Sequence, residues 1–368
     1  MNYFYRIINK IYTDIYNHLD KRTNRHIVVI ESDDWGSIRV PSRSVYDALI
    51  DEGFAMSTRP YERYDCLETD EDILALSEVL MKHQDAKGNH PIITMNYLCA
   101  NPDFDQIKRN GYKTYFYKTI NETYLDNIGS ENVITLVKDG IEKGIFRSQC
   151  HGREHFNVLE WLNALRSGNQ DVLTAFRYGM CGIFPKNNPS IGNQYMVAFR
   201  SNNDESMKYV CQVVSMSLNM FKEIWGYHSL SYIAPCYTWN DEIEKVLATN
   251  GVKLMQGGRV RRSSNSLSQR FYYAGEIKNG LVHSIRNCSF EPSTTKNFSI
   301  QALMNEIDNA FKNNKIAVIS SHRINYVGGI DVENRERNLN LLDRLLTILL
   351  KKYPTVEFLS SDKLINIL

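Results

Sequence analysis

The sequence predicts an α/β fold: a distorted or incomplete (β/α) barrel with about seven or eight mostly parallel strands, helical insertions and an extra N-terminal helix. Three observations lead to this prediction. Short β-branched runs alternate with segments of helical periodicity, and strands that alternate with helices form largely parallel sheets. The 368 residues are enough for one barrel with insertions. The 43% hydrophobic and 23% charged residues are typical of a globular protein with a large core.

The expected strands and helices follow one another along the chain. Runs rich in Val, Ile and Leu predict strands at residues 26–30, 91–95, 144–150, 230–234, 252–256, 281–285, 315–320 and 356–360. Apolar residues at helical spacing predict helices at residues 44–53, 70–83, 157–168, 241–251 and 338–352. This number of strands favours a barrel over an open sheet, although the barrel can be incomplete.

Residues 1–25 are expected to form an amphipathic helix, and residues 26–368 a single domain. The first segment has apolar side chains at helical spacing but lacks the apolar stretch of a membrane span and the cleavage site of a signal peptide. We expect this helix to pack on the flank of the domain; weak contact with a membrane surface is the alternative. Residues 101–132 and 171–227 interrupt the alternation and are expected to be mostly helical insertions that shape a substrate cleft.

Charge and cysteine content exclude several classes of protein. A formal net charge of +1 does not provide the positive potential that a nucleic-acid partner requires. Seven cysteines are an odd number, and no C-x-x-C pair occurs, which argues against a disulfide framework and against a four-cysteine zinc site. Together with the missing signal peptide, this pattern predicts a reducing, cytoplasmic location.

Polar groups suited to catalysis or metal binding follow four of the expected strands: Asp33 and Asp34, His151 and His155, the segment 235–240, and Ser321 with His322. The carboxyl ends of parallel strands in a β/α fold lie on one face, so these groups are expected to converge. An alternative for the acids is a loop in which Ser and Asp side chains bond backbone amides. That loop would leave two adjacent carboxylates beside a buried strand without a positive partner.

His151 and His155 are four residues apart, a spacing that suits two ligands of one metal ion. Two surface histidines at the start of a helix are the alternative. A third ligand from Asp33 or Asp34 would complete a His, His, carboxylate set with one open position for water. Such a site accepts one divalent ion, with Zn²⁺ favoured and Co²⁺, Ni²⁺ or Fe²⁺ as further candidates.

Four short motifs occur in an order that resembles the polysaccharide deacetylase family, metal-dependent carbohydrate esterases with a distorted β/α barrel. They are SDDWG from residue 32, HGREH from residue 151, IAPCY from residue 233 and ISSH ending at residue 322. The resemblance implies Asp33 as general base and His322 as general acid. It implies Asp34, His151 and His155 as metal ligands, and a backbone amide near Cys236 or Tyr237 as an oxyanion donor.

The sequence departs from the family pattern in two places. The arginine that steadies the catalytic aspartate in the family falls on Ile233, so we expect its role to be vacant or to be taken by Arg39, Arg153 or Arg323. The acid that normally orients the last histidine also has no clear match. Asp331 and Glu276 are the expected substitutes.

Several further polar or aromatic residues are expected to contact substrate: Tyr237, Trp35, Arg153, Arg323 and Asn325. Trp35 follows the aspartate pair and is expected either to stack on a sugar ring or to pack in the core. A hydrated loop equally explains the polar groups beside His322.

These features predict a metal-dependent hydrolase that uses activated water to remove an N-acetyl or O-acetyl group from an amino sugar, oligosaccharide or polysaccharide. The expected partner is therefore an acetylated carbohydrate. One alternative is a non-catalytic sugar-binding or scaffold protein with the same barrel. A less favoured alternative is a zinc peptidase of the inverted zincin type, in which Glu154 of HGREH is the base. That motif belongs on a helix, whereas here it follows a strand-like run and contains a glycine.

Overall fold

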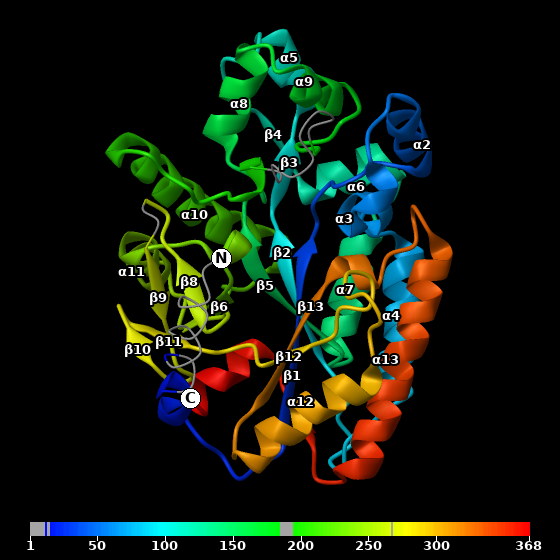
Figure 1. The fold of residues 1–368 in the computed structure, drawn as a ribbon, viewed down its shortest axis with the longest axis vertical. Helices are drawn as coiled ribbons and strands as arrows, with labels where there is room; N and C mark the ends of the chain where they lie inside the picture. The colour runs from blue at the N-terminus through cyan, green and yellow to red at the C-terminus, as the bar shows by residue number, and fades with distance from the viewer. Residues whose placement is uncertain (1–11, 13–14, 185–193, 266–267) are drawn as a thin grey trace.

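A ten-stranded sheet forms the centre of the protein in the computed structural model, which describes residues 12, 15–184, 194–265 and 268–368 (Figure 1). In sheet order the strands are β10 (Ile277–Lys278), β11 (Leu281–His283), β7 (Leu254–Met255), β6 (Ser231–Tyr232), β5 (Phe146–Gly152), β2 (Ile93–Leu98), β1 (Ile27–Trp35), β13 (Ala317–His322) and β12 (Cys288–Ser289), while β14 (Glu357–Phe358) pairs with β1. The pair β10–β11 is antiparallel and the other pairs in this sheet are parallel. Because β10 and β12 end the path without pairing to each other, the sheet is a half-barrel. The predicted fold class is confirmed.

Each of the eight expected strand runs contributes a strand to this sheet. The sheet exceeds the expected number because β10 and β12 also belong to it, and neither of them lies in a continuous apolar run that would indicate a strand. Two small antiparallel sheets lie apart from it: β3 (Ala100–Pro102) with β4 (Tyr117–Thr119), and β8 (Val260–Arg262) with β9 (Gln269–Phe271).

Helices surround the sheet. They are α2 (Arg43–Asp51), α3 (Pro60–Tyr64), α4 (Asp70–Met81), α5 (Phe104–Arg109), α6 (Ile120–Ile128), α7 (Val133–Glu142), α8 (Val158–Arg166), α9 (Gln170–Arg177), α10 (Asp204–Trp225), α11 (Asp241–Thr249), α12 (Ile300–Lys312) and α13 (Val332–Lys352). Short 3₁₀ turns are η1 (Met56–Thr58), η2 (Gln194–Met196), η3 (Pro235–Tyr237), η4 (Arg323–Asn325) and η5 (Ser361–Asn366). Local chemistry sets several ends. A capping box of Thr69 and Asp72 starts α4, and Gly226 in the left-handed region ends α10.

The outer face of the sheet is buried against these helices. Val28 and Ile30 of β1 and Ile93 of β2 are almost inaccessible to solvent and belong to the main apolar cluster, together with Leu76 of α4 and Leu346 of α13. Figure 1 shows α4, α12 and α13 along one flank of the sheet. This core holds the strands rigidly, so that side chains at their carboxyl ends keep fixed relative positions.

Part of the inserted segments lies beyond the carboxyl ends of the strands, whereas α10 packs on the sheet in the main apolar cluster. Residues 101–132 contain α5, α6 and the β3–β4 pair, and the described part of residues 171–227 contains α9, η2 and α10. Figure 1 shows α5, α8 and α9 gathered past the upper end of β1 and β2. These three helices share an apolar cluster, centred on the buried Trp161 and Phe176, which gives them a core of their own.

The predicted N-terminal helix falls mostly on residues that lie outside the described part of the chain. Residues 15–19 are helical, and Asp20 accepts hydrogen bonds from Arg259 at 2.6 Å and from Lys315 at 2.7 Å. The described end of this segment is therefore tied to the domain. Within the described ranges, no helix has the length and apolar character needed to cross a membrane.

Candidate active site

The end of β1 has an irregular backbone that sets the direction of its acidic side chains. The register of β1 against β2 shifts between Ser32 and Trp35, and Asp34 has a φ of 75°. A positive φ is uncommon for a residue with a side chain, and such conformations cluster at functional sites. In a regular strand, neighbouring side chains point to opposite faces. The irregularity instead lets Asp33 and Asp34 line the same cavity.

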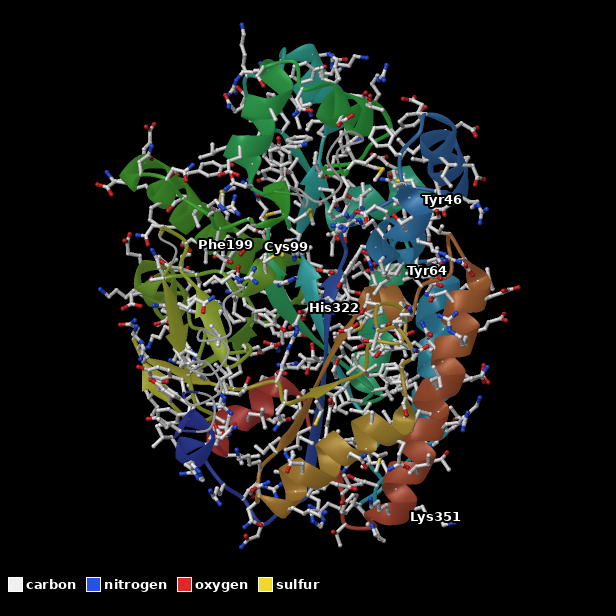
Figure 2. The ribbon with its side chains drawn as sticks, in the orientation of Figure 1. Tyr46, Tyr64, Cys99, Phe199, His322 and Lys351 are labelled. Atoms are coloured by element: carbon white, nitrogen blue, oxygen red, sulfur yellow. The ribbon has the colours of Figure 1, made fainter. Side chains whose placement is uncertain are left out.

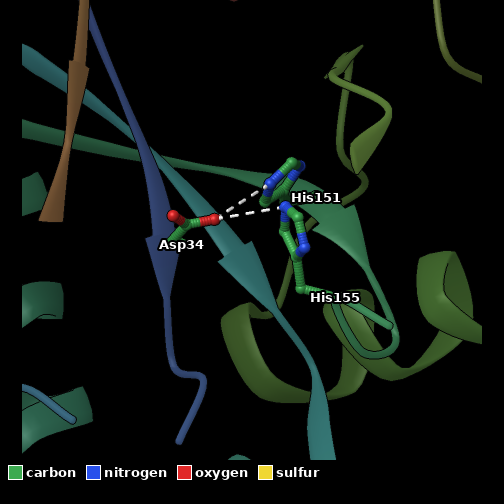
Figure 3. Close-up of side chains that lie close together, drawn as sticks. All are labelled: Asp34, His151 and His155. Atoms are coloured by element: carbon green, nitrogen blue, oxygen red, sulfur yellow. Dashed lines mark ion pairs between the residues drawn. The ribbon is translucent and has the colours of Figure 1, made fainter. Parts of the chain in front are cut away.

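The structure brings Asp34, His151 and His155 together (Figure 3). Asp34 Oδ1 lies 3.5 Å from His151 Nε2 and 3.4 Å from His155 Nε2. His151 belongs to β5, and His155 lies in the turn after it. Gly152, with a φ of 128°, begins that turn in a region that favours glycine. One ligand atom from each of the three residues lies within 4.8 Å of the others.

These atoms fit a divalent cation because they form a cluster of acceptors with no donor among them. His151 Nδ1 lies 2.9 Å from the carbonyl oxygen of Ile233, which fixes its proton on that nitrogen and leaves a lone pair on Nε2. His151 Nε2 and Asp34 Oδ1 are buried and find no hydrogen-bond partner among the described residues. Uncompensated buried acceptors are costly, and a cation would satisfy them. Two imidazoles and one carboxylate are ligands that zinc and related metals accept.

The protonation states of Asp34 and His155 agree with this fit. Burial by itself would lower the pKa of His151, but the hydrogen bond to Asp34 and the carboxylate charges raise it, so an ion would bind its Nε2 in place of a proton. Burial lowers the pKa of His155 to about 4 despite the nearby Asp34 carboxylate, so its ring is neutral at pH 7. Burial by itself would raise the pKa of Asp34, but the two histidines hold it well below its usual value. A neutral imidazole and an ionised carboxylate are the forms that bind metal.

Asp33 is held by an arginine that the sequence did not indicate. Arg286, which follows β11, donates from Nη1 and Nη2 to the two carboxylate oxygens of Asp33, each at 2.7 Å. Its Nε donates to Glu31 at 2.7 Å, and Asn96 donates to Asp33 at 2.8 Å. Burial by itself would raise the pKa of Asp33, but the charge and hydrogen bonds of Arg286 lower it to about 2.

The expectation that Arg39, Arg153 or Arg323 steadies Asp33 is therefore wrong. Arg153 forms a buried pair with Glu154 at 2.6 Å, and Arg323 is fully buried between Asp65 and Glu68. Arg39 lines the cavity, but its nearest carboxylate is Glu62 at 3.2 Å. Each of these guanidiniums is drawn to a closer acid, whereas Arg286 lies beside Asp33 because it stands two residues before β12, which pairs with β13, the neighbour of β1.

His322 ends β13 and lies opposite Asp33 in the strand register, near the middle of the molecule (Figure 2). Its Nδ1 is 2.5 Å from Glu291 Oε1, and its Nε2 is 3.9 Å from Asp33 Oδ2. Burial by itself would lower the pKa of His322, but the charge of Glu291 and the hydrogen bond to it raise this pKa well above its ordinary value. His322 therefore carries a proton at neutral pH and directs Nε2 toward Asp33.

Glu291 replaces the two acids that were expected to orient His322. Asp331 caps α13 by accepting a hydrogen bond from the amide of Asn334 at 3.0 Å, and Glu276 pairs with Arg270 at 2.5 Å. Neither lines the cavity that contains His322. Both expectations are corrected by the position of Glu291 in the connection between β12 and α12.

Four residues expected to contact substrate lie away from the cavity. Trp35 is fully buried, donates to Ser32 at 2.9 Å and stacks on Tyr326, so it packs in the core. Arg323 is likewise buried. Asn325 is fully buried and donates to Glu291 Oε2 at 2.8 Å, which holds the acid that orients His322. Arg153, 4% exposed and bound to Glu154, is also absent from the cavity wall.

Tyr237 lines the cavity, but its amide is not free to act as an oxyanion donor. That amide donates to the carbonyl oxygen of Ala234 at 3.1 Å, and its hydroxyl accepts from Arg286 at 3.1 Å. Cys236 and Tyr237 have φ values of 54° and 52°, so two consecutive non-glycine residues adopt the left-handed region here. Such local strain persists only where the surrounding structure imposes it.

One cavity of about 220 Å³ collects these groups. Asp33, Asp34, His151, His155 and His322 line its inner end. Its remaining wall is mostly apolar or aromatic, with Ile38, Tyr61, Phe156, Cys181, Met196 and Ile233. A concave, largely apolar pocket with a few convergent polar groups is typical of a small-molecule site.

Comparisons with known proteins support this fold. No family model and no curated protein matches the chain. A putative glycoside hydrolase/deacetylase from Parabacteroides distasonis has a TM-score of 0.50 at 9% identity, covering 95% of this chain and 72% of that one. A putative polysaccharide deacetylase from Mycobacterium smegmatis has a TM-score of 0.45 at 12% identity, covering 93% and 90%.

A third similar structure belongs to a longer protein. The 4-alpha-glucanotransferase from Thermococcus litoralis has a TM-score of 0.47 at 9% identity over 94% of this chain, which spans 40% of its length. At such identities a likeness shows the fold alone. The likeness to the Parabacteroides protein supports, at the level of the fold, the resemblance to polysaccharide deacetylases that the motifs indicated.

Proposed function

We propose that this protein is a metal-dependent hydrolase that removes an acetyl group from a nitrogen or oxygen of a carbohydrate. The observation that carries the proposal is the arrangement around one cavity. Three metal-ligating side chains lie beside an ionised carboxylate, Asp33, and a protonated imidazole, His322. A paired base and acid beside a metal site is what hydrolysis of an amide requires.

Asp34, His151 and His155 would hold the ion. When bound there, a divalent metal such as zinc supplies a polarised acyl carbonyl and a water molecule of lowered pKa. Asp33, kept ionised by Arg286, would accept the proton of the attacking water. His322, kept protonated by Glu291, would donate a proton to the leaving nitrogen or oxygen. Each acid or base role is typically worth about 10² to 10⁴ in rate.

The two alternative functions lose support. A scaffold protein was suggested by Ile233 at the position of the family arginine, yet Arg286, between β11 and β12, supplies a guanidinium to Asp33. An inverted zincin needs its histidines and glutamate on a helix. Here HGREH spans the end of β5 and the following turn, and Glu154 is engaged by Arg153 at 2.6 and 2.9 Å.

The test combines metal analysis with acetate release. We expect about one divalent ion per chain, and acetate release from N-acetylated or O-acetylated sugars that stops after chelation and returns when metal is added. Asp34→Ala and His151→Ala should lose the ion. Asp33→Asn should keep the ion and lose activity by about 10² or more. Arg43→Gln, at an exposed site on α2, serves as a control.

Two results would contradict the proposal. Wild-type activity in Asp33→Asn would show that Asp33 is not the base. An unchanged metal content in Asp34→Ala would show that the ion does not bind at the predicted centre. A metal-loaded protein that binds acetylated sugars without releasing acetate would favour the scaffold alternative.

A further inference from the structure

A short segment closes one side of the candidate active site. We name residues 178–184, which follow α9, the bridge. Its members Cys181 and Gly182 line the cavity. Met180, before Cys181 in the sequence, and Ile183, after it, are both buried. They belong to the same apolar cluster as Leu49 of α2. Cys181 itself packs in the cluster shared by α5, α8 and α9. The bridge thus joins the two parts of the chain that flank the site.

Contacts at both ends hold the bridge in place. The Tyr178 hydroxyl donates to Glu52 at 2.8 Å, and the Arg59 guanidinium lies 4.1 Å from the centroid of the Phe184 ring. Between these ends, Met180 is fully buried and its amide donates to the carbonyl oxygen of Ala175 at 2.9 Å. A segment with buried apolar side chains and satisfied backbone groups is a fixed wall and not a loose loop.

Arg39 provides a polar group in the wall of the cavity that the proposed chemistry does not use. Its Nη2 donates to Glu62 at 3.2 Å, while its Nε is buried and has no hydrogen-bond partner among the described residues. A buried donor without an acceptor is costly, and a ligand oxygen would satisfy it. Because Glu62 already balances the charge of Arg39, the site suits a neutral oxygen, such as a hydroxyl or carbonyl group.

The size of the cavity agrees with a small occupant. Its volume of about 220 Å³ is below the range of about 300–1,000 Å³ that is common for drug-sized ligands. A polymer bound through an interior residue needs free passage on both sides of that residue. The bridge occupies one of those sides.

We infer that this site takes a single acetylated sugar residue end-on, either free or at the end of a chain, with Arg39 binding one of its neutral oxygens. The inference rests on the proposed deacetylase function and narrows its substrate. The interior residues of a polysaccharide are excluded by the bridge.

The experiment compares substrates of increasing length with the metal-loaded wild-type protein. Acetate release is measured for N-acetylglucosamine, for its β-linked dimer, tetramer and hexamer, and for a soluble acetylated polymer, and mass spectrometry locates the residue that loses its acetyl group. We expect kcat/KM to be no higher for the hexamer than for the monomer or dimer, with loss confined to a terminal residue. A rise of about tenfold with length, with deacetylation of interior residues, would overturn the inference and leave the proposed function intact. No acetate release from any of these compounds or from O-acetylated sugars would contradict both.

Variants test the two structural elements separately. Arg39→Gln should raise KM for the monomer by about tenfold, the effect of one lost hydrogen bond, with kcat and metal content little changed. Arg43→Gln, at an exposed position four residues further on, is the matched control. The same KM in both variants would overturn the role of Arg39. Phe184→Ala should raise activity on the interior residues of a polymer, and Tyr178→Phe replaces it if that variant is unstable. Unchanged activity in either variant would show that the bridge does not exclude interior residues.

Discussion

Arg286 binds both carboxylate oxygens of Asp33 at 2.7 Å, although 253 residues separate the two in the chain. The same guanidinium binds Glu31, so one arginine contacts two buried acids of β1. Its single charge keeps Asp33 ionised, whereas burial raises the pKa of Glu31. Arg286 is 3% exposed in its side chain, and water cannot replace these contacts. The ionised state of Asp33 therefore depends on a residue from the connection between β11 and β12.

Arg286→Lys should lower kcat by about 10² or more while metal content stays unchanged. Lysine keeps the charge but has a single nitrogen, so it cannot bind both oxygens of Asp33 and Glu31 at once. Steady-state kinetics and metal analysis check this result, with Arg43→Lys on the exposed face of α2 as control. Activity within threefold of wild type would show that Asp33 does not need this contact.

Glu291→Gln should move the alkaline limb of the pH–rate profile to lower pH by about one unit or more. Glu291 raises the pKa of His322, so the proton of His322 is present below that raised pKa and is lost above it. Removing the negative charge lowers the pKa, and the proton is then lost at lower pH. The profile of kcat measures the shift, and Glu333→Gln, exposed on α13, should leave it in place. An unmoved limb in Glu291→Gln would show that His322 is not the titrating acid.

Adding zinc to metal-free protein should raise its melting temperature by several degrees. An ion that binds only the folded state, at a free concentration of 100 times its Kd, adds about 2.7 kcal/mol to the free energy of unfolding. Asp34→Ala and His155→Ala should abolish the increase, since each removes a ligand atom from the cluster. Thermal melts with and without zinc measure it. An equal increase in these variants would place the bound ion elsewhere.

His283 should make the fold less stable in mild acid. It is 2% exposed and stacks on Tyr272, and burial, followed by the charges of nearby arginines, lowers its pKa to about 3. The unfolded chain takes up a proton at this histidine near pH 6.5 and the folded protein does not. The contribution of neutral His283 to the free energy of unfolding is therefore fully present above pH 6.5. It is lost as the pH falls toward 3, by about 1.4 kcal/mol per pH unit.

Urea unfolding at pH 7.5 and pH 5 tests this prediction. The loss of stability between the two values should be smaller in His283→Gln than in the wild type. His228→Gln, which changes an exposed histidine, should behave like the wild type. Equal losses in all three proteins would contradict the buried, neutral state of His283.

Much of the fold could be predicted because each parallel strand carries its own signal. The run at residues 26–30 is β-branched and continuous, as buried parallel strands are, and it forms β1. The rule that such strands end on one face also predicted that Asp34 and the two histidines would meet. Arg286 directly follows the expected strand 281–285, so the same rule could have indicated it. Glu291 had no such signal, because no continuous apolar run indicates β12 before it.

By itself the sequence determined the order of strands and helices and the chemical types that end the strands, because hydrophobic periodicity and residue identity are local properties. Only the tertiary structure decided which arginine reaches Asp33, which acid holds His322 and that Trp35 lies in the core. Those outcomes depend on side-chain directions at strand ends and on competition among nearby opposite charges. Both are set by packing between segments that are separated in the chain, by 31 residues for Glu291 and His322 and by 253 for Arg286 and Asp33, which a linear pattern does not record.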